Sequence, residues 1–140
     1  MIVNNNFSRT VDMLHRGMSV ATLRDNVIAN NLANADVPNF KRTDVHFESE
    51  LRRALETERQ RPVLELRQTN QMHISNWNPR NFQDVQPRRV LDFLTQYNNN
   101  GNNVDPEMEF NMLLTNRMRY LLMAQSISFE FGQVNMVLRG

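Results

Sequence analysis

The chain has 140 residues, of which 40% are hydrophobic and 22% are charged, and these values are ordinary for one globular domain. Its formal net charge of +1 provides no strong field for nucleic acid or an anionic membrane, and the absence of cysteine excludes disulfides and thiol chemistry. No apolar run approaches the roughly 18 residues of a membrane-spanning helix, so we expect no direct membrane span.

The N-terminal part of the chain predicts a long helix that ends near Asn34. Residues 1–16 have no basic start followed by an apolar core, so we expect no secretory signal. From Phe7 onward, apolar side chains recur in alternating steps of four and three residues, which is the period of a coiled-coil seam. Pro38 disfavours a helical backbone at Val37 and so ends the helix. The predicted packing positions are Val11, Leu14, Met18, Ile28 and Leu32.

The middle of the chain, residues 41–103, is its most polar part and is predicted to be an inserted segment. Residues 44–60 have the pattern of a short amphipathic helix. A short strand is expected over residues 63–68, and residues 90–97 form an apolar element whose type the sequence leaves open. Residues 98–103, five asparagines and one glycine, predict a polar linker.

The C-terminal part gives the strongest helix signal. Asp105 is expected to cap this helix, Pro106 to occupy its first position, and Glu107 to favour the positive end of its dipole. Apolar residues then recur in steps of three and four, and a second apolar stripe with four methionines lies beside the first. The predicted packing positions are Phe110, Leu113, Tyr120, Ile127, Phe131, Val134 and Leu138.

Together these elements predict a mainly α fold. The long N- and C-terminal helices are expected to pair as a coiled coil, with a short irregular, β-containing segment between them. Residues 1–40 and 104–140 would form a helical core domain, and residues 41–103 would be inserted in it. One partner helix cannot cover both apolar stripes of the C-terminal helix, so the second stripe needs another chain. The pattern therefore indicates assembly, with other copies of this chain as partners.

Little in the sequence indicates catalysis. The three histidines lack the spacing of metal ligands, and the four glycines form no phosphate-binding motif, so we expect no enzyme activity, metal or cofactor. The basic cluster of Arg80, Arg88 and Arg89 lies among aromatic residues, as in some nucleic-acid-binding surfaces. Because Asp84 and Asp92 dilute its charge, we interpret it as an interface or a solvated loop and expect no nucleic-acid partner.

One motif follows the end of the first predicted helix. The sequence IANNLANADVPNFK at residues 28–41 resembles the N-terminal motif of bacterial flagellar axial proteins, the rod and hook family, in which ANNIAN precedes a TPGYK-like turn. Asn39 stands where glycine is common, and asparagine is the next-best residue at positive φ, so the turn is expected to survive. The amides at the helix end can satisfy backbone groups there and on a neighbour, or simply cap the helix. The residues matching this assembly motif are Asn30, Asn31, Ala33, Asn34, Pro38, Phe40 and Lys41.

The resemblance implies a structural subunit of the flagellar basal-body rod. Such subunits are exported by the flagellar type III export apparatus without a cleaved signal. They join neighbouring rod and basal-body proteins in the rod that crosses the periplasm, and they transmit motor torque. The short chain and the helix start at residues 102–105 are similar to the proximal rod subunits, of which two kinds have this size. The helices alone leave an alternative, a soluble coiled-coil adaptor or secretion chaperone that binds a partner helix in a groove.

Overall fold

A computed structural model describes residues 5–59, 70, 72 and 80–140. The strand predicted over residues 63–68 lies outside the described residues. The chain forms two compact units, one of Met1–Val45 with Arg89–Gly140 and the other of His46–Arg88. In chain order the elements are α1 (Asn5–Ala33), β1 (Thr43–His46), α2 (Glu48–Arg59), the 3-10 helix η1 (Phe82–Asp84), β2 (Arg88–Leu91) and α3 (Pro106–Arg139).

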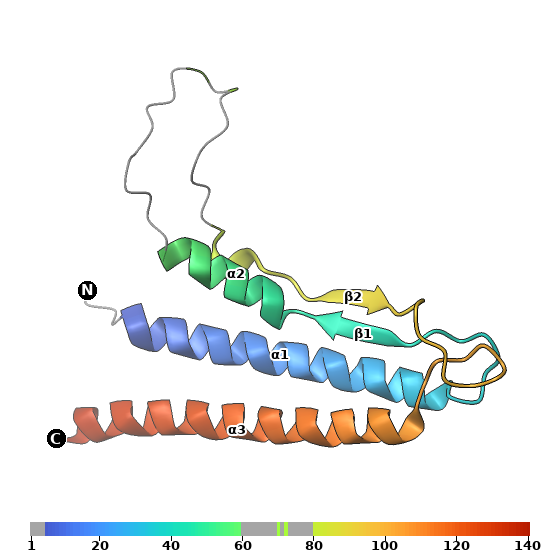
Figure 1. The fold of residues 1–140 in the computed structure, drawn as a ribbon. Helices are drawn as coiled ribbons and strands as arrows, with labels where there is room; N and C mark the ends of the chain where they lie inside the picture. The colour runs from blue at the N-terminus through green and yellow to red at the C-terminus, as the bar shows by residue number, and fades with distance from the viewer. Residues whose placement is uncertain (1–4, 60–69, 71, 73–79) are drawn as a thin grey trace. The chain divides into compact units, whose positions relative to one another are not determined.

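The larger unit is built on the two long helices. α1 and α3 lie side by side and antiparallel (Figure 1). The mainly α fold predicted from the sequence, with long paired terminal helices and a short β-containing middle, is thereby confirmed. We call the end that holds the last turn of α1 and the first turn of α3 the junction end. The opposite end, where α1 begins and α3 ends, is called the terminal end.

The start of α3 forms as its residue types require. The Asp105 carboxylate accepts hydrogen bonds from the backbone N–H groups of Glu107 and Met108, at 3.0 and 3.3 Å. These bonds satisfy two of the donors that the first turn of a helix leaves free. Pro106 occupies the first turn, where the absence of an N–H costs nothing. The predicted helix start is therefore confirmed, with Asp105 as the cap and Pro106 in the first turn.

Close packing of α1 on α3 depends on a glycine. A Cβ atom built on Gly17 would lie 2.7 Å from the sulfur of Met123. Because glycine has no side chain, the Met123 thioether can pack directly against the α1 backbone. Toward the terminal end, the rings of Phe7 and Phe131 meet edge to face with centroids 5.6 Å apart. Each fully buried aliphatic side chain adds about 1.5–3 kcal/mol to stability. Those that α1 contributes are Val20, Val27 and Ile28.

The first strand lies where sequence analysis predicted the start of a helix. That prediction was wrong for residues 44–47, because α2 begins only at Glu48. The side-chain amide of Asn31 accepts from the Thr43 N–H at 3.1 Å and donates to the Thr43 carbonyl at 2.8 Å, as a neighbouring strand would. The N–H of Asp92 also donates to the Arg42 carbonyl at 2.8 Å. These bonds hold the backbone extended, so that β1 pairs with β2 in a two-stranded sheet.

The smaller unit consists of α2 and η1 with their connections. Ala54 on α2 and Phe82 on η1 are buried, and the two elements are in contact. The Asn81 side chain caps η1 by accepting from the Gln83 N–H at 3.0 Å. The helical part of the predicted amphipathic segment is thus present, and its apolar face packs within this unit.

Candidate functional site: a buried polar junction and an exposed helix face

A cluster of polar side chains lies buried at the junction end of the larger unit. We call it the polar junction and define it by Asn31, Arg42, Asn102, Asn103 and Glu109. Asn31, Asn102 and Glu109 have no exposed surface, and Asn103 retains 5%. Burying such groups is unfavourable unless each finds hydrogen-bond partners. The partners therefore decide whether this cluster stabilises the fold.

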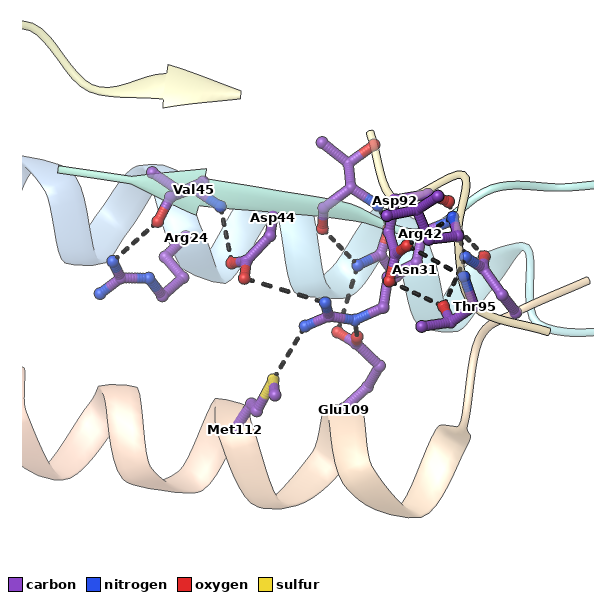
Figure 2. A network of polar contacts seen from close by, with 12 residues as sticks. Arg24, Asn31, Arg42, Asp44, Val45, Asp92, Thr95, Glu109 and Met112 are labelled. Atoms are coloured by element: carbon purple, nitrogen blue, oxygen red, sulfur yellow. Dashed lines mark hydrogen bonds and ion pairs between the residues drawn. The ribbon is translucent and has the colours of Figure 1, made fainter. Parts of the chain in front are cut away.

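The centre of the polar junction is the carboxylate of Glu109. One of its oxygens pairs with the Arg42 Nε, and the other accepts from the Asn31 amide at 3.2 Å (Figure 2). The Arg42 guanidinium also reaches the Met112 sulfur at 3.1 Å and lies 3.8 Å from the Asp44 carboxylate. Both carboxylate oxygens are satisfied, so this buried charge has the compensation that such a group requires.

Asn102 ties the end of α1 to the start of α3. Its amide nitrogen donates to the backbone carbonyls of Asn34, Ala35 and Val37, at 2.9, 2.8 and 2.9 Å. Its side-chain oxygen accepts from the Val104 N–H at 2.7 Å. The last turn of a helix leaves carbonyls without intrahelical partners. Here the Asn102 side chain donates to carbonyls just after the end of α1. One neutral amide therefore fixes the direction in which the chain leaves α1.

Asn103 performs a similar role for the connection that follows β2. Its oxygen accepts from the Arg42 N–H at 2.6 Å, and its nitrogen donates to the Asp92 carbonyl at 2.7 Å and the Thr95 hydroxyl at 3.1 Å. Residues 98–103 form a linker before α3, as predicted, but Asn102 and Asn103 within it are buried. Each amide carries both donors and an acceptor, which suits it to a buried position among backbone groups.

The predicted assembly motif lies along this end of the larger unit. Asn31 is its fully buried member. The amide of Asn34 donates to the Asn30 carbonyl at 2.7 Å, which is the capping role left open by the sequence. The ammonium group of Lys41 donates to the Gly101 carbonyl at 2.8 Å. The other members are the exposed Ala33 and Pro38 and the partly buried Phe40.

Asn39 forms the turn expected after α1. Its φ is 60°, and it is the one non-glycine residue with positive φ among the residues that the structure describes, so the prediction is confirmed. Its N–H donates to the Asn100 carbonyl at 3.1 Å. A Cβ on Gly101, itself at φ 81°, would lie 2.6 Å from the Asn39 side-chain oxygen. Both positions thus need a residue that tolerates the left-handed region in a tight crossing.

We expect Asn39→Ala to lower the free energy of unfolding by about 1 kcal/mol, because alanine has a steric penalty at positive φ and no side-chain bond to offset it. Asn39→Gly should stay within about 0.5 kcal/mol of the parent, since glycine adopts this φ freely. Urea denaturation of the three purified chains, followed by circular dichroism, provides the comparison. Equal stability of the alanine and glycine variants would contradict the backbone explanation.

The predicted packing positions divide between the helix contact and the surface. Ile28 is buried, and Val11, Leu14, Met18 and Leu32 are partly buried on α1. On α3, Leu113 and Ile127 are partly buried. Tyr120, Phe131 and Val134 are exposed at 38%, 48% and 36%, although Phe131 contacts Phe7. Phe110 and Leu138 are exposed at 61% and 76%.

Two polar residues occupy buried positions on α3 that the apolar pattern missed. Glu109 belongs to the polar junction, and Asn116 donates to the Ala21 carbonyl at 2.7 Å and to the Asp25 carboxylate at 2.6 Å. Arg117 lies beside them, 3.7 Å from Asp25. The two buried residues are seven positions apart, so they follow the same heptad period as the predicted packing positions, and Glu109 directly precedes Phe110.

A broad apolar surface remains uncovered along α3. We call it the exposed α3 face. Large side chains on it keep between 48% and 82% of their surface accessible. Its members are Met108, Phe110, Leu114, Met118, Leu121, Leu122, Phe129, Met136, Val137 and Leu138. Many large apolar side chains left exposed on one helix usually mark an interaction site.

The smaller unit contains a cavity of about 520 Å³ lined by Glu50, Arg80, Asn81, Asp84, Val85, Gln86 and Arg88. No group of three or more histidine, aspartate or glutamate side chains among the described residues could hold a metal ion. Within those same residues, no helix is long and apolar enough to cross a membrane. The polar junction supports the geometry of the chain, and the exposed α3 face is available for binding.

Comparison with known proteins identifies relatives of this chain. A family model described as "Flagella basal body rod protein" matches residues 13–41, which span much of α1 and the motif after it. The flagellar basal body rod protein FlgB of Borreliella burgdorferi is 43% identical over 135 residues, covering 96% of this chain and 99% of that protein. FlgB of Bacillus subtilis is 32% identical over 136 residues and 96% of each chain.

These findings make the chain a structural protein of the bacterial flagellar basal body, a subunit of its rod. The sequence alone left open two kinds of short proximal rod protein, and the similarity to curated relatives shows which of the two families this chain belongs to. The chain belongs to the FlgB family of flagellar basal body rod proteins. The alternative of a soluble adaptor or secretion chaperone has no support in these comparisons.

Proposed function

We propose that the chain enters the rod through the exposed α3 face, packing there against other copies of itself and against neighbouring rod and basal-body proteins. The observation that carries this proposal is the exposure of Leu121, Leu122 and Phe129, at 66%, 63% and 64%, on a helix whose other face already packs on α1. At about 25 cal/mol per Å² of apolar surface, covering such side chains supplies a large driving force for assembly.

Within the rod, the two long helices supply stiffness. In this proposal the helical core domain, residues 1–40 with 104–140, forms the wall of the rod, and the middle segment 41–103 leaves it at the Asn39 turn. The predicted packing positions and the assembly motif take part in these contacts. Motor torque passes through the helix contacts from one subunit to the next. The antiparallel pairing of α1 with α3 supports this arrangement.

The export route to the rod is inferred from the resemblance to flagellar axial proteins. We propose that the flagellar type III export apparatus carries the chain without a cleaved signal, and that the rod it joins crosses the periplasm. Mass spectrometry of the chain from purified basal bodies tests the proposal, since removal of an N-terminal peptide would contradict it.

We expect Leu122→Asp to reduce incorporation into basal bodies more than tenfold. A carboxylate buried without a partner at an interface costs several kcal/mol, and each 1.4 kcal/mol is a factor of ten. Because Leu122 is exposed in the single chain, the thermal midpoint of the purified variant should change little. Immunoblots of purified basal bodies and a motility assay measure the effect.

Leu122→Met is the matched control, because it keeps an apolar side chain of similar volume at the same position. It should incorporate and support swimming like the parent. Normal incorporation of the aspartate variant would show that this face stays in contact with solvent and would overturn the proposal.

A further inference from the structure

A closed turn precedes α3 at the junction end of the larger unit, and we call residues 98–102 the asparagine turn. The N–H of Asn98 donates to the Asn102 carbonyl at 2.9 Å, and the N–H of Gly101 donates to the Asn98 carbonyl at 3.2 Å. The turn lies beside the segment that follows α1 (Figure 1). Its own hydrogen bonds therefore fix the conformation of its backbone.

The asparagine turn contains the one Asn–Gly pair of the chain, Asn100 with Gly101. In such a pair the backbone nitrogen of the glycine can attack the side-chain carbonyl carbon of the asparagine. The amide nitrogen then leaves as ammonia with the proton of the attacking N–H, and a five-membered succinimide ring remains. Water opens this ring at either carbonyl, so that aspartate or isoaspartate replaces asparagine. Glycine favours the attack because it has no Cβ in the way and adopts most backbone conformations.

The folded turn occupies both groups that would have to react. The attacking nitrogen, that of Gly101, donates its proton to the Asn98 carbonyl. The side-chain oxygen of Asn100 accepts from the Asn102 N–H at 3.1 Å, which fixes the orientation of the amide. Ring closure requires the backbone between Asn100 and Gly101 to rotate until nitrogen and carbon meet. The native hydrogen bonds oppose that rotation.

Contacts from the segment after α1 also hold the turn closed. The Asn39 N–H donates to the Asn100 carbonyl at 3.1 Å, and the Lys41 ammonium group donates to the Gly101 carbonyl at 2.8 Å. A Cβ on Gly101 would lie 2.6 Å from the Asn39 side-chain oxygen, so the turn has little room to change shape. The Asn100 side chain is exposed, so water is already present when the turn opens.

We propose that Asn100 is a modification site, at which the chain converts its own amide to a succinimide and then to aspartate or isoaspartate, and that the closed asparagine turn restrains this conversion in the folded chain. The reaction consumes one water molecule and releases one ammonia. Its rate depends on the fraction of time for which the turn is open. Assembly through the exposed α3 face is not required for it.

The two products should differ in their effect on the fold. Aspartate leaves the backbone unchanged, and its side-chain oxygen can still accept from the Asn102 N–H. Isoaspartate routes the main chain through the former side chain, which adds one methylene carbon to the turn and displaces its carbonyls from Asn39 and Lys41. Thermal unfolding should therefore give a lower midpoint for the isoaspartate form than for Asn100→Asp, which represents the other product.

Mass spectrometry of the purified full chain at physiological pH and temperature tests the proposal. One sample is unfolded in guanidinium chloride, and the other is folded in sodium chloride at the same ionic strength. Peptide mapping should locate a gain of one dalton at Asn100 in the unfolded chain. The folded chain should gain it at least tenfold more slowly, because a turn that is open for less than a tenth of the time reacts correspondingly less.

Two glutamine variants identify the reacting residue. Asn100→Gln should abolish the gain at this position, because its longer side chain would have to close a six-membered ring, which forms far less readily. Asn99→Gln is the matched control, since it makes the same change at the preceding exposed position and should react like the parent. Both variants are compared in guanidinium chloride, so a failure to fold does not affect the result.

Lys41→Met tests the restraint in the folded chain. It keeps an unbranched side chain but cannot donate to the Gly101 carbonyl, so Asn100 should convert at least threefold faster than in the parent. In guanidinium chloride the two chains should react equally. Arg52→Met, which removes a positive charge from an exposed position in the smaller unit, should leave the folded rate unchanged.

Three results would overturn the proposal: no conversion at Asn100 in the unfolded chain, equal rates in the folded and unfolded chains, or a folded rate that Lys41→Met leaves unchanged. None of these results bears on incorporation into basal bodies, which the Leu122 variants measure separately.

Discussion

Replacing Glu109 by leucine is expected to destabilise the purified chain by about 3–5 kcal/mol, because the change leaves the Arg42 guanidinium buried without its main partner. It also removes the acceptor for the Asn31 amide. The single variant Arg42→Met should be similarly damaging, since it strands the fully buried carboxylate. Urea denaturation followed by circular dichroism measures both effects.

The double variant Arg42→Met/Glu109→Leu separates the interaction from the loss of each group. Removing both charges together is expected to recover part of the stability, because neither charge is then left buried alone. Glu107→Gln is the matched control in the same turn of α3. Its side chain is exposed, so it should lose only the dipole interaction of about 0.3–1 kcal/mol. Additive single losses in the double variant would contradict the coupling of the two residues.

Replacing Asn102 by aspartate is expected to cost at least about 3 kcal/mol at neutral pH. The amide that serves three backbone carbonyls becomes a carboxylate with no donor, and its charge faces the oxygens of Asn34, Ala35 and Val37. The buried Ala35 carbonyl loses its donor, which costs about 1–3 kcal/mol, whereas the Asn34 and Val37 carbonyls still accept from the N–H groups of Val37 and Phe40. The unpaired buried charge supplies the rest of the expected loss. At low pH the penalty should shrink, because a protonated carboxyl can again donate one hydrogen bond.

Asn99→Asp is the matched control, since it makes the same chemical change three residues away at an exposed position. We expect it to change stability by less than about 0.5 kcal/mol. Thermal unfolding of both variants across a series of pH values provides the measurement. A penalty for Asn102→Asp that does not depend on pH would show that the lost donor is not the cause.

The features that could be predicted from the sequence depend on neighbouring residues. The start of α3 follows from Asp105 and Pro106, whose effects act within one helical turn. The positive φ of Asn39 follows from its place in a turn motif. The long helices follow from apolar periodicity over many turns. In each of these cases the controlling contacts lie close together in the chain.

The polar junction could not be predicted because its bonds join distant parts of the chain. Asn31 and Glu109 are 78 residues apart, and Asn102 is 68 residues from Asn34. A run of asparagines predicts a polar linker, and the burial of some of its members cannot be recognised when their distant partners are unknown. The burial of Glu109 on α3 could not be predicted for the same reason. An apolar pattern assigns this residue to the surface, whereas Asn31 and Arg42, from distant parts of the chain, bind its carboxylate in the interior.

The amide contacts of Asn31, Asn102 and Asn103 have a consequence for the environment in which the protein works. Most of their hydrogen bonds join uncharged groups, so dissolved ions screen them little. A surface pair such as Arg117 with Asp25 weakens as ionic strength rises. The bend between α1 and the following segment should therefore keep its geometry when the ionic strength of the surroundings changes.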